Sequence, residues 1–126
     1  MHKSRLGTIV IDCETDDLSG AEEFWSQALG CPARHSDDQA DEKYVELVTP
    51  DGEVKILLQS VEHPSRVHLD IETNDVEAEV QRLERLGARR VEQTRRWWVM
   101  EAPSGHRFCV VRPQRSTFEE DATQWG

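Results

Sequence analysis

The feature that most constrains this chain is that its two halves repeat one pattern. In the first half, a helical pattern ends at Leu29-Gly30, and alternating apolar residues then surround the turn Pro50-Asp51-Gly52. In the second half, the same features recur at Leu86-Gly87 and Pro103-Ser104-Gly105. Similar halves in a chain of 126 residues indicate two copies of one supersecondary unit. We therefore predict a single domain whose function lies in the groove between the copies.

Composition narrows the possible partners. Lys and Arg number 15 against 25 Asp and Glu, which gives a net charge of −10 and disfavours binding to a phosphate backbone. No apolar run approaches the ~20 residues that span a bilayer. The start of the chain has no apolar core of a signal peptide. The odd number of cysteines, with no Cys-x-x-Cys, is typical of free thiols in a reducing compartment, so we expect a cytoplasmic protein with no nucleic-acid or membrane partner.

Periodicity divides each half into a strand, a helix and three further strands. Period-two alternation predicts the strands, and apolar residues at helical spacing predict the helices. Asp16-Asp17 is expected to cap the first helix, and Asn74 with Glu77 is expected to form a capping box on the second. The predicted parts are a first module at about 5–61, a second module at about 65–113 and a tail at 114–126.

Two segments fit neither module. The acidic stretch Ser36 to Glu42 is expected to be a solvated surface loop, with a lid over the groove as the alternative. The polar tail carries Phe118 and Trp125, which either dock onto the body or a second subunit, or belong to a frayed end. These aromatics are compatible with a homodimer.

Three stretches carry a family resemblance. They are Asp17-Leu18 through Phe24-Trp25 and Leu29-Gly30, then Arg66-Val67-His68-Leu69-Asp70, and finally Ala102-Pro103-Ser104-Gly105-His106-Arg107-Phe108-Cys109-Val110-Val111. In this order and spacing the chain resembles the vicinal oxygen chelate superfamily, which includes glyoxalase I, extradiol dioxygenases, and bleomycin and fosfomycin resistance proteins. It is most similar to the glyoxalase-like domain subgroup. The resemblance implies an α+β fold of two tandem βαβββ modules, with a curled eight-stranded mixed sheet around a cleft and the helices outside.

Strand alternation indicates which side chains of the fifth strand face that cleft. The apolar residues Val67, Leu69 and Ile71 are expected to pack on helices. The alternate residues then face the cleft, and these are Arg66, His68 and Asp70.

The metal ligands of the superfamily, usually His or Glu, are largely replaced in this chain. The resemblance puts His68 on a ligand position, but Cys109 and Leu57 stand where Glu is usual. A catalytic divalent ion normally takes three protein ligands and an open position. We therefore favour a site without metal or other cofactor; if an ion does bind, the conceivable ligands are His68, Cys109 and Asp12.

The remaining candidates concern an organic ligand. His68 is a proton-transfer candidate or a structural histidine, and Cys109 is expected to be a buried, inert thiol that lines the ligand site. Arg66 and Asp70 either anchor an anionic or polar ligand or take part in ion pairs between strands. Trp97 and Trp98 point to opposite faces of their strand, so one joins the core and the other lines the cleft.

The predicted function is the binding of a small organic molecule, without metal, in the central cleft. The ligand-lining candidates are Arg66, Asp70, Leu57, Trp97, Trp98 and Cys109. The alternative is a lyase, isomerase or dioxygenase that uses His68 as its catalytic residue, with or without a divalent metal. A third hypothesis is a sensing or partner module with a vestigial cleft. The sequence leaves open whether the chain is an enzyme.

Overall fold

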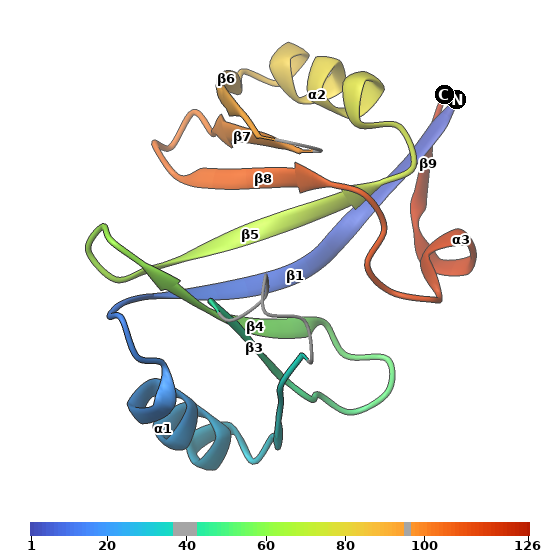
Figure 1. Cartoon of the computed structure of the whole chain (residues 1–126). Coiled ribbons are helices and arrows are strands. Elements are labelled where there is room, and N and C mark those ends of the chain that lie inside the picture. The colour runs from blue at the N-terminus through green and yellow to red at the C-terminus, as the bar shows by residue number, and fades with distance from the viewer. Residues whose placement is uncertain (37–42, 95–96) are drawn as a thin grey trace. The chain divides into compact units, whose positions relative to one another are not determined.

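A computed structural model describes residues 1–36, 43–94 and 97–126 of the chain (Figure 1). In this part of the chain, nine strands and three helices form an α+β fold with a mixed sheet, as predicted. Most of the predicted acidic loop, 37–42, lies outside the described residues. The elements are β1 (His2–Glu14), α1 (Ser19–Leu29), β2 (Ala33–Arg34), β3 (Tyr44–Leu47), β4 (Lys55–Val61), β5 (Arg66–Thr73), α2 (Val76–Arg85), β6 (Arg89–Gln93), β7 (Trp98–Glu101), β8 (Arg107–Val111), α3 (Phe118–Asp121) and β9 (Thr123–Trp125).

The order of these elements contains the predicted βαβββ pattern twice, as β1-α1-β2-β3-β4 and as β5-α2-β6-β7-β8. By its contacts the chain divides into two compact units. One unit is Thr8–Val67, and the other combines Met1–Gly7 with His68–Gly126. Strand β1 therefore belongs to both units. None of the helices in the described part of the chain is long and apolar enough to cross a membrane.

In the unit Thr8–Val67 the strands are hydrogen-bonded in the order β2-β3-β4-β1. Strand β1 runs parallel to β4, and β3 runs antiparallel to it. One sheet face packs against α1, where Trp25 contacts a cluster that contains Leu47 and Leu58, both 0% exposed. Burial of this apolar face accounts for the stability of the α1 layer.

Helix α1 begins and ends close to the predicted positions. The N-cap residue is Leu18, which has no capping side chain, rather than the predicted Asp16-Asp17. Asp17, one residue earlier, accepts a hydrogen bond from the Ser19 amide at 2.9 Å, and Gly30 ends the helix in the left-handed conformation, with φ of 68°. The buried apolar face of α1 is narrow, because Phe24 and Leu29 are exposed.

The second unit repeats this plan with the strand order β5-β8-β7-β6. Strand β5 runs parallel to β8, which runs antiparallel to β7. Val80 and Leu83 of α2 pack against Met100 and Val110 of β7 and β8. Ile71 of β5 joins the edge of this cluster.

Two local predictions for this unit and its boundary were wrong. Val67 and Leu69 were expected under helices but are 56% and 45% exposed, because the α2 cluster reaches only Ile71. The capping residue of α2 is Asp75, whose carboxylate accepts from the Ala78 amide at 3.1 Å. Asn74 instead accepts a hydrogen bond from the Lys3 amide at 2.9 Å.

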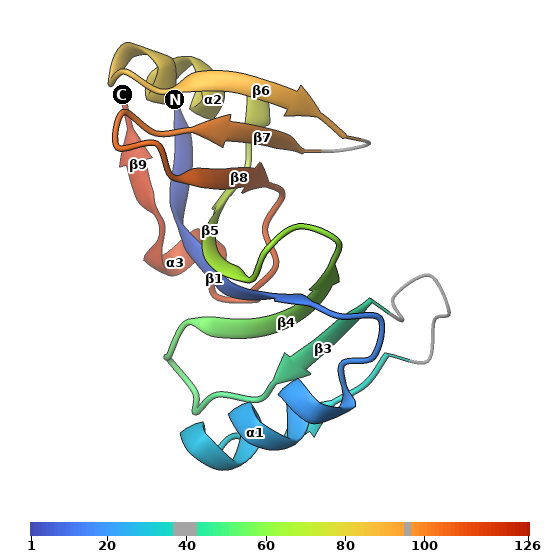
Figure 2. The same ribbon diagram turned by 90° about the vertical axis from the view of Figure 1, so that its left-hand side faces the viewer.

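The tail docks onto its own chain, so the alternative of a frayed end was wrong. Phe118 is 3% exposed, and β9 pairs antiparallel with the start of β1, with His2 opposite Trp125 (Figure 2). The Trp125 indole donates to the Ser4 hydroxyl at 2.8 Å. Strand β9 is an additional strand, because the sequence analysis predicted a sheet of only eight strands.

Candidate functional site

The parallel pair β5 and β8 brings together three side chains that can carry chemistry. Asp70 stands directly opposite Cys109 in the register of the two strands. His68 lies two residues before Asp70 and therefore on the same sheet face, opposite to the face on which Ile71 packs under α2. The cluster His68–Asp70–Cys109 thus arises from strand alternation and from one cross-strand register.

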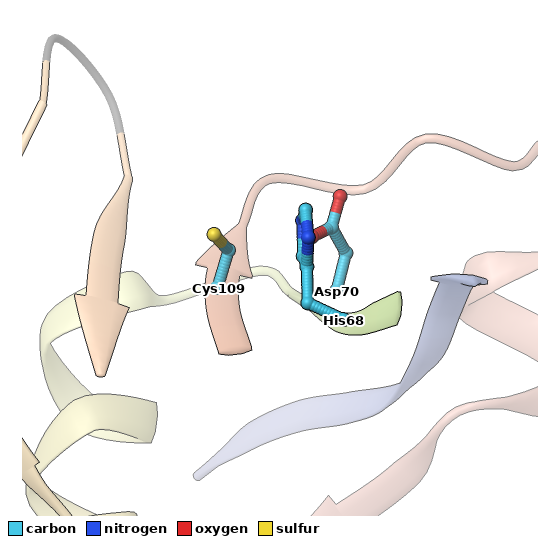
Figure 3. Close-up of side chains that lie close together, drawn as sticks. All are labelled: His68, Asp70 and Cys109. Carbon is cyan, nitrogen blue, oxygen red and sulfur yellow. The ribbon is translucent and has the colours of Figure 1, made fainter. Parts of the chain in front are cut away.

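The three side chains are partly buried and close to one another (Figure 3). Their ligand atoms all lie within 4.8 Å of one another, and His68 Nε2 is 3.3 Å from Asp70 Oδ1. The two side chains of that pair are only 13% and 16% exposed. Asp70 Oδ1 is buried with no hydrogen-bond partner in the described part of the chain. A buried carboxylate oxygen that accepts no hydrogen bond lowers the stability of the folded state. On this face of the sheet, the Asp70 oxygen is therefore available to accept a hydrogen bond.

The neighbouring strand β7 shows which tryptophan joins the core. Trp98 packs against the α2 cluster, with the Arg90 guanidinium 5.0 Å from its ring centroid. Alternation places Val99, which pairs with Cys109, on the opposite face. Trp97 lies just before β7, and its position on that same face stays a prediction. An apolar residue, Val99, therefore accompanies the His68–Asp70–Cys109 cluster on its face of the sheet.

Other predicted residues lie in the unit Thr8–Val67. The Asp12 side chain is 2% exposed, and its Oδ2 atom lies 3.8 Å from both His63 Nε2 and Arg66 Nε. Arg66 therefore pairs with Asp12 in this unit. Leu57 is partly buried on β4, opposite Val10 of β1. His63, which the sequence analysis did not single out, lies beside Asp12, and its position in the segment between β4 and β5 gave no periodic signal.

The other cysteines have structural surroundings. Cys31 is buried in the α1 core, and Cys13 packs at the edge of that core. Burial, and secondarily the negative charge of Asp12, raises the pKa of the Cys13 thiol. All three cysteines are free thiols. Cys109 differs because its neighbours are an imidazole and a carboxylate.

The donor chemistry of the cluster fits a divalent metal. An imidazole nitrogen, a thiolate sulfur and a carboxylate oxygen are ligands of Zn²⁺, and three protein ligands with one open position are typical of catalytic zinc. The orphaned Asp70 oxygen would gain a partner in such a site. This set contains two of the predicted ligands, His68 and Cys109, with Asp70 as the third.

Comparison with known proteins agrees with the fold. The model of the glyoxalase-like domain family matches residues 8–111, so the chain belongs to that family, within the vicinal oxygen chelate superfamily. Among curated proteins, none matches the sequence.

Solved structures with a similar fold include three from bacteria. Methylmalonyl-CoA epimerase from Mycobacterium tuberculosis is 22% identical, with 87% of this chain and 88% of that chain covered and a TM-score of 0.63. A hypothetical protein from Bacillus halodurans is 13% identical, with 90% and 96% covered and a TM-score of 0.63. Streptomyces coelicolor methylmalonyl-CoA epimerase in complex with 2-nitronate-propionyl-CoA is 20% identical, with 88% and 98% covered and a TM-score of 0.59. At these identities the likeness concerns the fold.

Proposed function

We propose that this glyoxalase-like domain binds a small organic molecule, without a metal, on the sheet face that carries the His68–Asp70–Cys109 cluster. The observation that carries the proposal is the buried Asp70 oxygen, which has no hydrogen-bond partner among the described residues. A donor group of a ligand would satisfy this oxygen, because a half-buried carboxylate binds an N–H or O–H more strongly than a neutral acceptor does. His68 offers a second polar contact beside it.

The rest of the face supplies apolar area. Trp97 gives a planar surface that suits an aromatic or cationic group, and Val99 lies opposite Cys109. The net charge of −10 favours a cationic ligand over an anionic one. A few polar groups on a mostly apolar lining is the usual composition of a small-molecule site.

The test is saturable binding without turnover. A panel of aromatic cations and acyl-CoA thioesters, the latter chosen because similar folds hold them, is titrated while the melting temperature and tryptophan fluorescence are measured. Trp97→Ala is expected to weaken binding of any hit by about tenfold, or about 1.4 kcal/mol, in the range of one aromatic contact. Phe24→Ala, an exposed aromatic of the other unit, is the control. Equal affinity in Trp97→Ala and the control would reject this face as the binding surface.

The close approach of the three donors favours a second candidate, an isomerase or lyase that depends on a divalent metal. A bound ion would be held by His68, Asp70 and Cys109 and would supply Lewis-acid polarisation of a substrate carbonyl. In an enzyme whose ion is held without His68, the imidazole of His68 would instead transfer a proton to or from the substrate carbon next to the carbonyl.

Metal content separates the two candidates. Untagged protein is incubated with Zn²⁺, Ni²⁺, Mn²⁺ or Fe²⁺, dialysed and measured by plasma mass spectrometry. The metal-free proposal predicts no ion at equimolar level. A near-stoichiometric ion that is lost in His68→Ala and in Asp70→Ala, but retained in Asp12→Ala, would replace that proposal with the metal-dependent one.

A further inference from the structure

A row of charged side chains lies beside the His68–Asp70–Cys109 cluster on the same face of the sheet. Arg89 of β6 stands opposite Glu101 of β7, and Glu101 stands opposite Arg107 of β8, in three adjacent strands (Figure 2). Met100 and Phe108, their neighbours in sequence, pack under α2. Alternation therefore directs these charged side chains to the face away from α2, and we call them the Arg89–Glu101–Arg107 row.

The Glu101 carboxylate holds both arginines but uses only one donor of each. Arg89 Nε donates to Glu101 Oε2 at 2.8 Å, and Arg107 Nε donates to Glu101 Oε1 at 3.3 Å. Among the described residues, neither arginine side chain has another hydrogen-bond partner, so their Nη1 and Nη2 groups can bind a further acceptor. The side chains of Arg89 and Arg107 are 62% and 37% exposed, so a ligand can reach them.

Two arginines share one acid, and the row therefore keeps one positive charge. The hydrogen bond from Arg89 is the main cause that holds the pKa of the Glu101 carboxyl below its usual range, so Glu101 is ionised at neutral pH. Arg90, on the α2 face of β6, shows the contrast. It donates to the carboxylates of both Glu77 and Glu84, which more than balance its charge.

The position of the row relates it to the proposed binding face. Arg107 precedes Cys109 by two residues on β8, which is about 7 Å along a strand. Although the net charge of the whole chain is −10, salt screens charges more than about 8 Å away, so the nearest groups decide what binds beside Arg107. Asp70, opposite Cys109, repels an acid and accepts from a donor. The face thus has one end for an acid group and another for a donor.

We propose that the Arg89–Glu101–Arg107 row binds the carboxylate or phosphate group of the small molecule held on this face, and that this ligand is an organic anion with an N–H or O–H donor for Asp70. The inference rests on the proposed function and names the class of its ligand. The planar fork of an arginine matches two oxygens of a carboxylate or a phosphate. Because both guanidiniums bond to one carboxylate, they are close enough together to share one acid group of a ligand.

The experiment follows the arginine Nε–H signals and the backbone amides of the ¹⁵N-labelled full chain by NMR, at constant ionic strength and with EDTA present. The probe 4-hydroxyphenylacetate carries an acid and a donor. Phenylacetate carries only a carboxylate, benzylphosphonate only a phosphonate, and 4-methylphenol only a donor. We expect the three acids, but not 4-methylphenol, to shift the Nε–H signals of Arg89 and Arg107 saturably. 4-Hydroxyphenylacetate should bind about tenfold more tightly than phenylacetate, because its hydroxyl also donates to Asp70. The tighter of phenylacetate and benzylphosphonate tells which acid group the row prefers.

Variants assign the effect to the row. Arg107→Gln should weaken binding of phenylacetate about tenfold, and Arg89→Gln combined with Arg107→Gln should abolish the saturable shift. Arg85→Gln is the matched control, because it removes the same charge from the exposed surface of α2, which covers the other sheet face. Equal losses in Arg107→Gln and Arg85→Gln would indicate a long-range effect of charge and overturn the inference. Absence of a saturable shift of Arg89 and Arg107 in the unaltered chain would also overturn it, and that measurement decides alone if the double variant unfolds.

Failure of this inference is distinguishable from failure of the proposed function. A probe that shifts the amides of Cys109 and Val99, while the Nε–H signals of Arg89 and Arg107 stay unchanged with every acid, would overturn only the assignment of the acid group. If the acids shift both arginines but no probe shifts the amides of Cys109 and Val99, the proposed binding face is rejected and only an anion site remains at the row.

Discussion

Glu79 illustrates how single residues shape this fold. Its side chain is 0% exposed, yet His2 Nε2 lies 2.8 Å from Oε1, and Arg82 donates to both carboxylate oxygens, each at 2.8 Å. Burial opposes ionisation of Glu79. Hydrogen bonds from Arg82, His2 and Ser4 outweigh it and hold the pKa of the carboxyl below its usual range.

This arrangement predicts acid sensitivity. Because the folded-state pKa is lowered, the contribution of Glu79 to stability is present above the pKa of an unfolded glutamate, about 4.3, and is lost as the pH falls through the folded value. The unfolding free energy, measured with urea between pH 3 and 7, should therefore fall below about pH 4.3. Glu79→Gln should lower stability at pH 7 by about 1–3 kcal/mol and flatten the acid limb. Glu120→Gln, on the exposed surface, is the control, and an unchanged acid limb in Glu79→Gln would contradict this account.

At the residue scale the sequence predicted part of the candidate site. His68 and Cys109 were found because the family resemblance placed them on ligand positions. The approach of Asp70 to Cys109 depends on the parallel register of β5 and β8, which no local pattern in the sequence specifies. The same alternation rule that placed His68 failed for Val67 and Leu69, because it says nothing about how far a covering helix extends.

Among the elements, the long periodic segments were predicted best. Strand β9 was missed because its three residues, Thr123–Trp125, have no alternation and form a strand only by pairing with β1. Tertiary contacts therefore create this element. The Trp125 ring lies 3.8 Å from the Arg82 guanidinium, so β9 also covers the charge that neutralises Glu79.

Removal of β9 should therefore weaken the unit that contains it. Deletion of residues 122–126 removes the stacking on Arg82 and the bond to Ser4. We expect a loss of about 2 kcal/mol in the unfolding free energy, the size of a partly desolvated cation–π contact, together with a lower melting temperature. Trp125→Phe, which keeps an aromatic ring but no indole N–H, should lose less. A deletion variant as stable as the full chain would show that β9 docks without a net energetic contribution.

On the scale of the whole molecule, the repeat and the periodicity predicted the order of the elements, and the family resemblance predicted the fold class. It did not reveal where the compact units divide. The second unit takes Met1–Gly7 from the far end of the sequence, so it is not a contiguous second half. A repeat in sequence records which elements follow one another, whereas the compact unit depends on which strands pair.

Strand β1 belongs to both units, and its first residues pair with the last residues of the chain. The edge of the sheet at His2–Ser4 is complete only when Thr123–Trp125, which lie far along the sequence, have paired with it. Contacts between such distant positions slow folding, because the loop between them must close before they contribute. The start of β1 is thus expected to stay an unpaired strand edge, open to association with other chains, until Thr123–Trp125 pairs with it.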